Sequence, residues 1–194
     1  MAKLKETPSQ TAGPFLHIGT LPTVAGLRVS QPERQNVLAG SRTLGGPIRI
    51  EGQIFDGAGA LVKDAMVEIW QANANGQYGS NELRSWGRAA TDFETGLFWF
   101  ETIKPGSVSF RDGRPQAPHV SFSIFARGIN IHLQTRMYFP DEAAANAVDP
   151  ALKAVADPRL IETLIARKET RGADTVYRFD IRLQGERETV FFDF

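Results

Sequence analysis

Cysteine is absent from this chain of 194 residues. Its absence excludes disulfide bonds, thiolate zinc sites and thiol nucleophiles, and it suits a reducing compartment. The first ten residues also lack the continuous apolar stretch of a secretory signal peptide. From these two absences we expect a cytoplasmic protein.

An excess of charge of either sign is absent too, because 22 Lys and Arg residues are balanced by 22 Asp and Glu residues. Without a basic stripe, nucleic acid is not an expected partner, and no apolar run is long enough to cross a membrane. A net charge of zero removes the repulsion that opposes association of soluble proteins. This balance fits either coincidence or a chain that works inside an assembly.

Familiar catalytic motifs are missing as well. The sequence contains no G-x-S-x-G nucleophile elbow, no P-loop, no H-E-x-x-H zinc motif and no EF-hand loop. Only three histidines are present (His17, His119 and His132), and none lies at helical metal-ligand spacing from another. Considered singly, each is better explained as a structural or interface residue than as a metal ligand.

The chain does contain a series of short segments in which apolar and polar residues alternate, as in half-buried strands. The clearest segment is 177–184, and Asp56-Gly57-Ala58-Gly59 is a typical turn signal. We therefore predict an all-β protein with an antiparallel β-sandwich fold. The other predicted strands are 48–54, 65–72, 97–103, 119–126, 131–139 and, at the end of the chain, 190–194.

Helical signals are confined to one region of the sequence. Asp157 followed by Pro158 is a favourable helix start, and apolar residues then recur at helical spacing through Arg167. Shorter helical turns are predicted for 141–147 and 152–155.

The N-terminal part is rich in Pro, Gly, Ser and Thr and shows little periodicity. We predict an extended arm over residues 1–45, which packs on another surface through Phe15, Ile18 and Leu21. The length of the chain suits one domain, with the sandwich itself spanning residues 46–194.

Residues 116–125 carry the pattern of an incomplete metal site. They read Q-A-P-H-V-S-F-S-I-F, and alternate residues of a strand share one face, so His119 and Ser121 point the same way. A histidine at position 121 would complete an H-x-H pair. The neutral hydroxyl of serine is a poor ligand for a transition metal.

Several segments together resemble the intradiol ring-cleavage dioxygenases, over about residues 45–194. They are W-Q-A-N-A-N-G-Q-Y at 70–78, T-I-K-P-G at 102–106, A-P-H-V-S-F-S-I-F at 117–125, M-Y-F at 137–139 and Y-R-F-D-I at 177–181. Three further segments resemble the iron-free alpha chains of the heteromeric members of this family. These are T-P-S-Q-T-A-G-P at 7–14, F-A-R-G-I-N-I-H-L at 125–133 and the ending G-E-R-E-T-V-F-F-D-F.

Iron in this family is held by two tyrosines and by the two histidines of an H-x-H pair. By resemblance, Tyr78 and His119 match one tyrosine and the first histidine, whereas Val108 and Ser121 stand at the other two ligand positions. Gln116 replaces an arginine three residues before the first histidine, and the loop between Val108 and His119 looks shorter than in iron-binding chains. We therefore expect no metal site here, only four vestigial positions.

The resemblance implies an alpha subunit that works beside a homologous, iron-binding beta chain in a higher hetero-oligomer. Fe(III) would be bound by the partner beta chain, and the assembly would cleave protocatechuate with O2 to 3-carboxy-cis,cis-muconate. The substrate-binding residues implied for this chain are Thr11, Gly13 and Pro14 in the arm, together with Arg127, because an arginine suits an aromatic carboxylate. No catalytic residue is expected in this chain alone.

Two other functions are open at this point. One is a transthyretin-like β-sandwich that binds without catalysis, although such a module needs neither W-Q-A-N nor F-A-R-G-I-N. The other is a self-sufficient catechol-type dioxygenase, which Val108 and Ser121 disfavour. One observation would distinguish the alpha subunit, the binding module and the self-sufficient dioxygenase. It is whether an iron-tyrosinate colour develops only when a beta-like chain is co-expressed.

Overall fold

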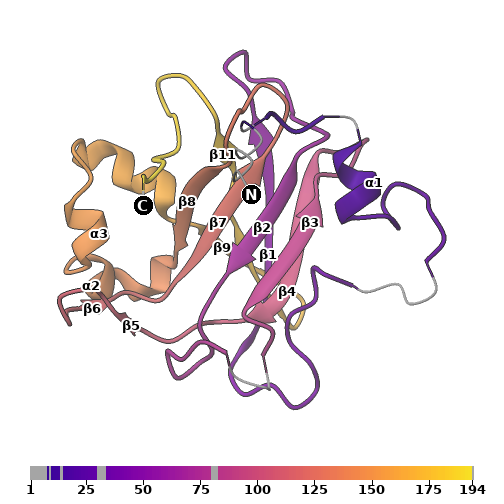
Figure 1. Cartoon of the computed structure of the whole chain (residues 1–194). Helices are drawn as coiled ribbons and strands as arrows, with labels where there is room; N and C mark the ends of the chain where they lie inside the picture. Colours follow the sequence, from indigo (N-terminus) through magenta and orange to yellow (C-terminus); the bar gives the residue numbers. More distant parts are fainter. Residues whose placement is uncertain (1–7, 9, 14, 30–33, 80–82, 194) are drawn as a thin grey trace, which may run out of the picture.

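Two β-sheets pack face to face in the computed structural model, which describes residues 8, 10–13, 15–29, 34–79 and 83–193 (Figure 1). One sheet has the order β3-β2-β7-β8, and all of its pairs are antiparallel. Its strands are β2 (Met66–Trp70), β3 (Trp86–Ala90), β7 (His119–Phe125) and β8 (Leu133–Tyr138).

The second sheet has β1 at its centre, with β4 antiparallel on one edge and β10 followed by β11 parallel on the other. Strand β9 extends this sheet beyond β10. The predicted sandwich is confirmed, although this sheet is mixed. Its strands are β1 (Pro47–Phe55), β4 (Leu97–Ile103), β9 (Arg167–Arg171), β10 (Asp174–Arg178) and β11 (Ile181–Arg182).

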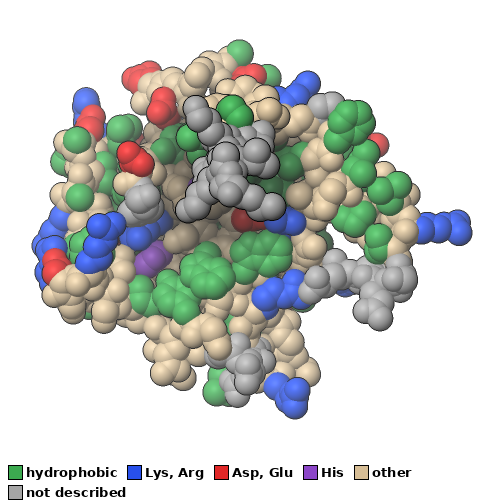
Figure 2. All heavy atoms as spheres, in the orientation of Figure 1, with side chains coloured by type: hydrophobic (Ala, Val, Ile, Leu, Met, Phe, Trp, Pro, Cys, Tyr) green, Lys and Arg blue, Asp and Glu red, His purple; other side chains and the backbone are tan. Residues whose placement is uncertain are grey.

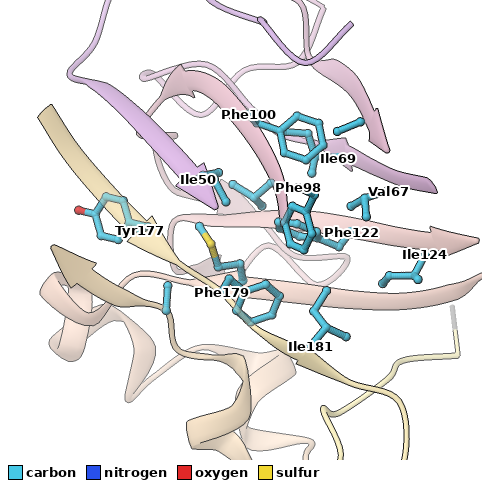
Figure 3. Packing of buried hydrophobic residues seen from close by; sticks show 14 of the residues in the cluster. Ile50, Val67, Ile69, Phe98, Phe100, Phe122, Ile124, Tyr177, Phe179 and Ile181 are labelled. Atoms are coloured by element: carbon cyan, nitrogen blue, oxygen red, sulfur yellow. The ribbon is translucent and has the colours of Figure 1, made fainter. Parts of the chain in front are cut away.

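The alternation of apolar residues explains the core between the sheets. Phe122 of β7 lies against Phe98 and Phe100 of β4, with ring centroids 6.1 and 6.5 Å apart, and against Phe179 at 5.2 Å (Figure 3). All four rings are fully or almost fully buried. Because aromatic pairs bury large areas and favour such tilted contacts, this cluster holds the two sheets together.

The continuous strand predicted for 177–184 is wrong. β10 ends at Arg178 and β11 begins at Ile181, and both pair with β1. Between them, the carboxylate of Asp180 accepts a hydrogen bond from the backbone N–H of Gln53 at 3.1 Å. A side chain thus replaces a backbone carbonyl in the ladder, and this replacement interrupts the strand.

The N-terminal arm is not wholly extended, because it contains the short helix α1 (Leu16–Thr20) beside β3 (Figure 1). Leu21 is buried as predicted, whereas Phe15 and Ile18 are exposed on this chain. His17 is also buried, with its ring edge-on to Phe93 at 5.5 Å. The arm therefore packs on the sandwich through Leu21 and an unpredicted histidine.

The C-terminal half carries short helices on the β8 side of the sandwich (Figure 1). Asp157 caps the predicted helix by accepting from the N–H of Arg159, but the helix is a 3-10 helix that ends at Leu164, where the chain turns into β9. Residues 190–193 form no strand, although Phe192 donates its N–H to Gln134. The helical elements are η1 (Pro140–Glu142), α2 (Ala143–Asn146), α3 (Pro150–Lys153) and η2 (Pro158–Leu164).

Within the described part of the chain, no helix combines the length and the apolar composition that a membrane crossing requires.

Two further strands, β5 (Val108–Ser109) and β6 (Pro115–Gln116), form a small hairpin of their own just before β7.

Gly52 of β1 lies in close contact with its neighbours in the same sheet, because it pairs with Phe98 of β4 and lies beside the segment that carries Phe179. A Cβ atom at this position would lie 1.9 Å from the carbonyl oxygen of Phe179 and 2.5 Å from the Phe98 ring. We predict that Gly52→Ala lowers the free energy of unfolding by roughly 3 kcal/mol. The added methyl group would clash with the backbone carbonyl of Phe179, which cannot move away as a flexible side chain can. Urea denaturation measures this loss.

The matched control is Gly46→Ala, just before β1, where a Cβ atom meets nothing within 4 Å. Equal stabilities of the two variants would show that β1 does not approach Phe179 as described.

Candidate functional site

The outer face of the β3-β2-β7-β8 sheet carries the vestigial positions. Val120 and Phe122 of β7 point into the core, so His119 and Ser121 point outward. Ser121 is paired with Trp70 on β2 and with Arg136 on β8. We call Tyr78, Val108, His119 and Ser121 together the vestigial centre.

Tyr78 follows β2 and lies over this face. Its ring stacks on that of Trp70, with centroids 5.7 Å apart and an interplanar angle of 10°. Trp70 is 47% and Tyr78 44% exposed, and hydrophobic side chains gather over the middle of this side of the molecule (Figure 2). Partial burial raises the pKa of the Tyr78 phenol, and the charge of Arg136 opposes that shift.

The W-Q-A-N and T-I-K-P-G segments form one structural unit beneath this face. Gln71 is fully buried, and it donates to the carbonyl of Ile103 at 3.0 Å and accepts from the hydroxyl of Thr102 at 2.8 Å. Gly76 and Gly106 belong to the same contact, because a Cβ at either glycine would strike the backbone of the other segment. These motifs therefore fix the backbone on which Tyr78 stands.

His119 begins β7 and is buried, with its ring tilted against Tyr138 at 5.6 Å. Its Nδ1 lies 2.8 Å from the carbonyl oxygen of Ala117, which acts as the acceptor if Nδ1 carries the proton. Burial, assisted by the charge of Arg136, lowers the pKa of His119 from 6.5 to about 4, despite the opposing hydrogen bond with Ala117. The imidazole is therefore neutral at physiological pH.

Val108 and Gln116 are opposite each other in the β5-β6 hairpin. Gln116 donates to the carbonyl of Ser109 at 3.1 Å, and its side-chain oxygen accepts from Nη1 of Arg136 at 2.7 Å. Buried Asp149 accepts from the N–H of Ala117 at 2.8 Å and anchors the segment that leads into β7. The segment before His119 is therefore a hydrogen-bonded hairpin, with an apolar side chain at position 108.

This donor set does not fit a ferric ion. Two of the four positions carry an apolar side chain and a neutral hydroxyl, and neither supplies the imidazole or phenolate that iron requires. Among the residues described, no group of three or more His, Asp or Glu side chains is placed to hold a metal ion. The vestigial centre therefore lacks two of the four ligands that the resemblance assigns to iron.

The predicted substrate-binding residues lie elsewhere, at the turn that follows β7. The hydroxyl of Thr11 donates to the carbonyl of Ala126 at 3.3 Å and accepts from the N–H of Gly128 at 3.0 Å, so the arm is attached to the turn that carries Arg127. Gly13 lies close by in the arm, and a Cβ atom at this position would meet nothing within 4 Å. Pro14 lies outside the described residues.

Arg127 has a partner that sequence reasoning missed. Its Nε lies 2.5 Å from a carboxylate oxygen of Asp64, while its side chain remains 71% exposed. Asp64 immediately precedes buried Ala65, at the start of the β2 segment, and nothing in the local sequence links it to position 127. The ion pair orients the guanidinium and leaves it open to solvent.

These two groups of residues are at opposite ends of β7. His119 begins the strand and Arg127 follows its last residue, Phe125, so roughly 20 Å of strand separates them. The structure thus brings Thr11 and Arg127 together but keeps both away from the vestigial centre. A ligand at Arg127 would not reach His119.

Comparisons with known proteins show which family the chain is similar to. The model of the family described as Dioxygenase matches residues 28–185. The chain is 51% identical over 196 residues to the protocatechuate 3,4-dioxygenase alpha chain of Pseudomonas putida, covering 98% of both chains. It is 34% identical over 172 residues to the protocatechuate 3,4-dioxygenase beta chain of Burkholderia cepacia, covering 80% of this chain and 72% of that one.

Among solved structures, the dioxygenase domain of a dioxygenase carbohydrate-binding protein fusion from Streptomyces sp. SirexAA-E is similar, with a TM-score of 0.58. The match covers 95% of this chain and 100% of that one at 21% identity, so it supports the fold alone.

The lowered pKa of His119 generates a prediction about stability. An unfolded histidine takes up a proton near pH 6.5, whereas His119 in the folded chain does so near pH 4. In this interval the unfolded state binds more protons, so the contribution of His119 to the free energy of unfolding falls by roughly 3 kcal/mol as the pH is lowered from 6.5 to 4 and does not change further below pH 4.

The control is His119→Asn, whose amide can still donate to Ala117 but does not titrate. Urea denaturation of both chains between pH 7.5 and 4 measures the difference. Parallel stability curves for the two chains would contradict a buried, neutral His119.

Proposed function

We propose that this chain, which belongs to the intradiol dioxygenase family, is the alpha subunit of a heteromeric protocatechuate 3,4-dioxygenase. The enzyme would cleave the ring of protocatechuate between its two hydroxyl-bearing carbons, with O2, to give 3-carboxy-cis,cis-muconate. Similarity to both an alpha and a beta chain of such enzymes supports a hetero-oligomer of two homologous chains.

The observation that carries this proposal is the loss of metal ligands within a preserved scaffold. Val108 and Ser121 occupy two of the four ligand positions, yet the unit formed by Gln71, Thr102 and Ile103 is intact. A chain that keeps the scaffold but cannot hold iron needs a partner that can. Fe(III) bound by a beta chain would supply the chemistry that makes the catechol reactive toward O2.

The contribution of this chain would be to complete the pocket of that partner. Nε of Arg127 is engaged by Asp64, which leaves the terminal nitrogens of an exposed guanidinium available to meet a carboxylate. Thr11 secures the arm beside this turn, and Gly13 allows another backbone to approach closely. Pro14 would line the same pocket. A cytoplasmic location and a higher hetero-oligomer belong to the same proposal.

A binding module without catalysis and a self-sufficient catechol dioxygenase are the competing functions. The first leaves the preserved Gln71 unit unexplained, and the second requires a metal centre that the donor set of the described residues does not provide. Activity that appears only when this chain is mixed with a beta chain would exclude both.

Arg127→Ala in the assembled enzyme should reduce kcat/KM for protocatechuate by about 10- to 100-fold and leave that for catechol almost unchanged. The lost interaction is a charge-assisted hydrogen bond to the carboxylate, worth roughly 1.5–3 kcal/mol, and catechol has no carboxylate. Steady-state kinetics with both substrates, together with sizing of the complex, measure the effect.

The matched control is Arg159→Ala, because Arg159 is also exposed and also paired with an aspartate, Asp157 at 2.7 Å. Equal losses for the two substrates, or a complex that dissociates on dilution, would assign Arg127 to subunit contact instead of carboxylate recognition.

Deletion of residues 1–14 should damage catalysis by the assembled enzyme far more than it damages the sandwich. The first sheet strand begins at Pro47, and Thr11 attaches the arm by two hydrogen bonds at the surface. Circular dichroism and thermal unfolding report the fold, and turnover of protocatechuate reports the pocket. If fold and activity were lost together, the arm would be a structural element of the sandwich and not a wall of the pocket.

A further inference from the structure

Arg136 was not among the residues that the sequence singled out, yet it lies beside the vestigial centre. Its strand position is directly opposite Ser121 in the β7-β8 ladder, and Ser121 is in turn opposite Trp70. All three are on the outer face of the sheet, so the side chain of Arg136 shares the surface with position 121. The serine that replaces a metal-binding histidine therefore stands beside a permanent cation.

The guanidinium of Arg136 contacts residues that surround the vestigial centre. Nη1 donates to the side-chain oxygen of Gln116 at 2.7 Å. The guanidinium also hydrogen-bonds the phenol of Tyr138, whose ring lies against His119. Its charge reaches both retained ligand positions, because it contributes to the environment of Tyr78 as well as of His119.

We propose that Arg136 is an internal cation that takes the place of the metal ion in the vestigial centre. Its fork of donors satisfies acceptors around the site, and its positive charge repels any metal cation that Tyr78 and His119 could otherwise attract. Metal exclusion in this chain would then have two causes, which are the loss of ligands and the presence of a competing charge. The proposal concerns this chain alone and does not depend on the substrate or on the partner chain.

A structural role without metal exclusion is the competing explanation. Arg136 is half-buried, and its Cζ also lies 5.8 Å from the centroid of the Phe192 ring, a contact that secures the end of the chain. Both explanations predict that loss of Arg136 affects stability. Only the first predicts that its charge controls metal affinity once a second histidine is supplied.

Zinc binding to the full-length chain expressed alone separates these explanations. Ser121→His restores the H-x-H pair beside Tyr78, and Zn²⁺ is suitable because it accepts imidazole and oxygen ligands. Isothermal titration at pH 7.5 would compare Ser121→His with Ser121→His/Arg136→Gln and Ser121→His/Arg136→Lys. We expect the Gln variant to bind Zn²⁺ at least 10-fold more tightly than Ser121→His, and the Lys variant to bind as weakly as Ser121→His.

One control shows where the zinc is bound. Adding His119→Asn to the Ser121→His/Arg136→Gln variant should abolish the tighter binding. Affinities that agree within threefold for all three variants, or a Lys variant that binds as tightly as the Gln variant, would overturn the proposal.

A second substitution covers the case in which the Arg136 variant does not fold. If Arg136→Gln unfolds the chain, Arg136→Met keeps the length of the side chain and its contact with Phe192, and the same comparison applies. If both are unfolded without metal, refolding of the Ser121→His combinations by one equivalent of Zn²⁺ supports the proposal. Failure of Zn²⁺ to refold them overturns it.

Discussion

The pairing of β7 between β2 and β8 is the constraint on which the rest of the structure depends. It sends Val120 and Phe122 into the core and fixes Trp70, Ser121 and Arg136 in one row on the outer face. A register shift of a single residue would exchange the two faces, so the aromatic core and the vestigial centre are determined by the same hydrogen bonds. The backbone around the vestigial centre is therefore held by the same strand pairing as the core.

Strand β7 also separates the vestigial centre from the residues that we propose bind substrate. At one end, His119 is buried and neutral beside Ser121, whose neutral hydroxyl is a poor metal ligand. At the other end, the turn after Phe125 holds Arg127 in an ion pair with Asp64 and receives the hydroxyl of Thr11. Packing would maintain the end of β7 at His119. The role of Arg127 and Thr11 in the pocket of a partner chain would maintain the other end.

Much of the fold could be predicted because alternation is a local signal, as the match between predicted 97–103 and β4 shows. β9 was missed because its sequence, R-K-E-T-R, is polar on both faces of an edge strand. In the site, resemblance located Tyr78, His119 and Ser121. Arg136 and Asp64 could not be found in this way, because their importance comes from cross-strand and long-range partners that no local pattern records.

The central claim is that one chain of the pair carries the iron and this one does not. Metal analysis of the complex purified after co-expression with a beta chain tests this claim most directly, with the ratio of chains measured on the same sample. The account predicts one iron for each pair of chains, together with the visible tyrosinate band. Two irons for each pair would contradict it, because the second ion would have to be bound at the vestigial centre.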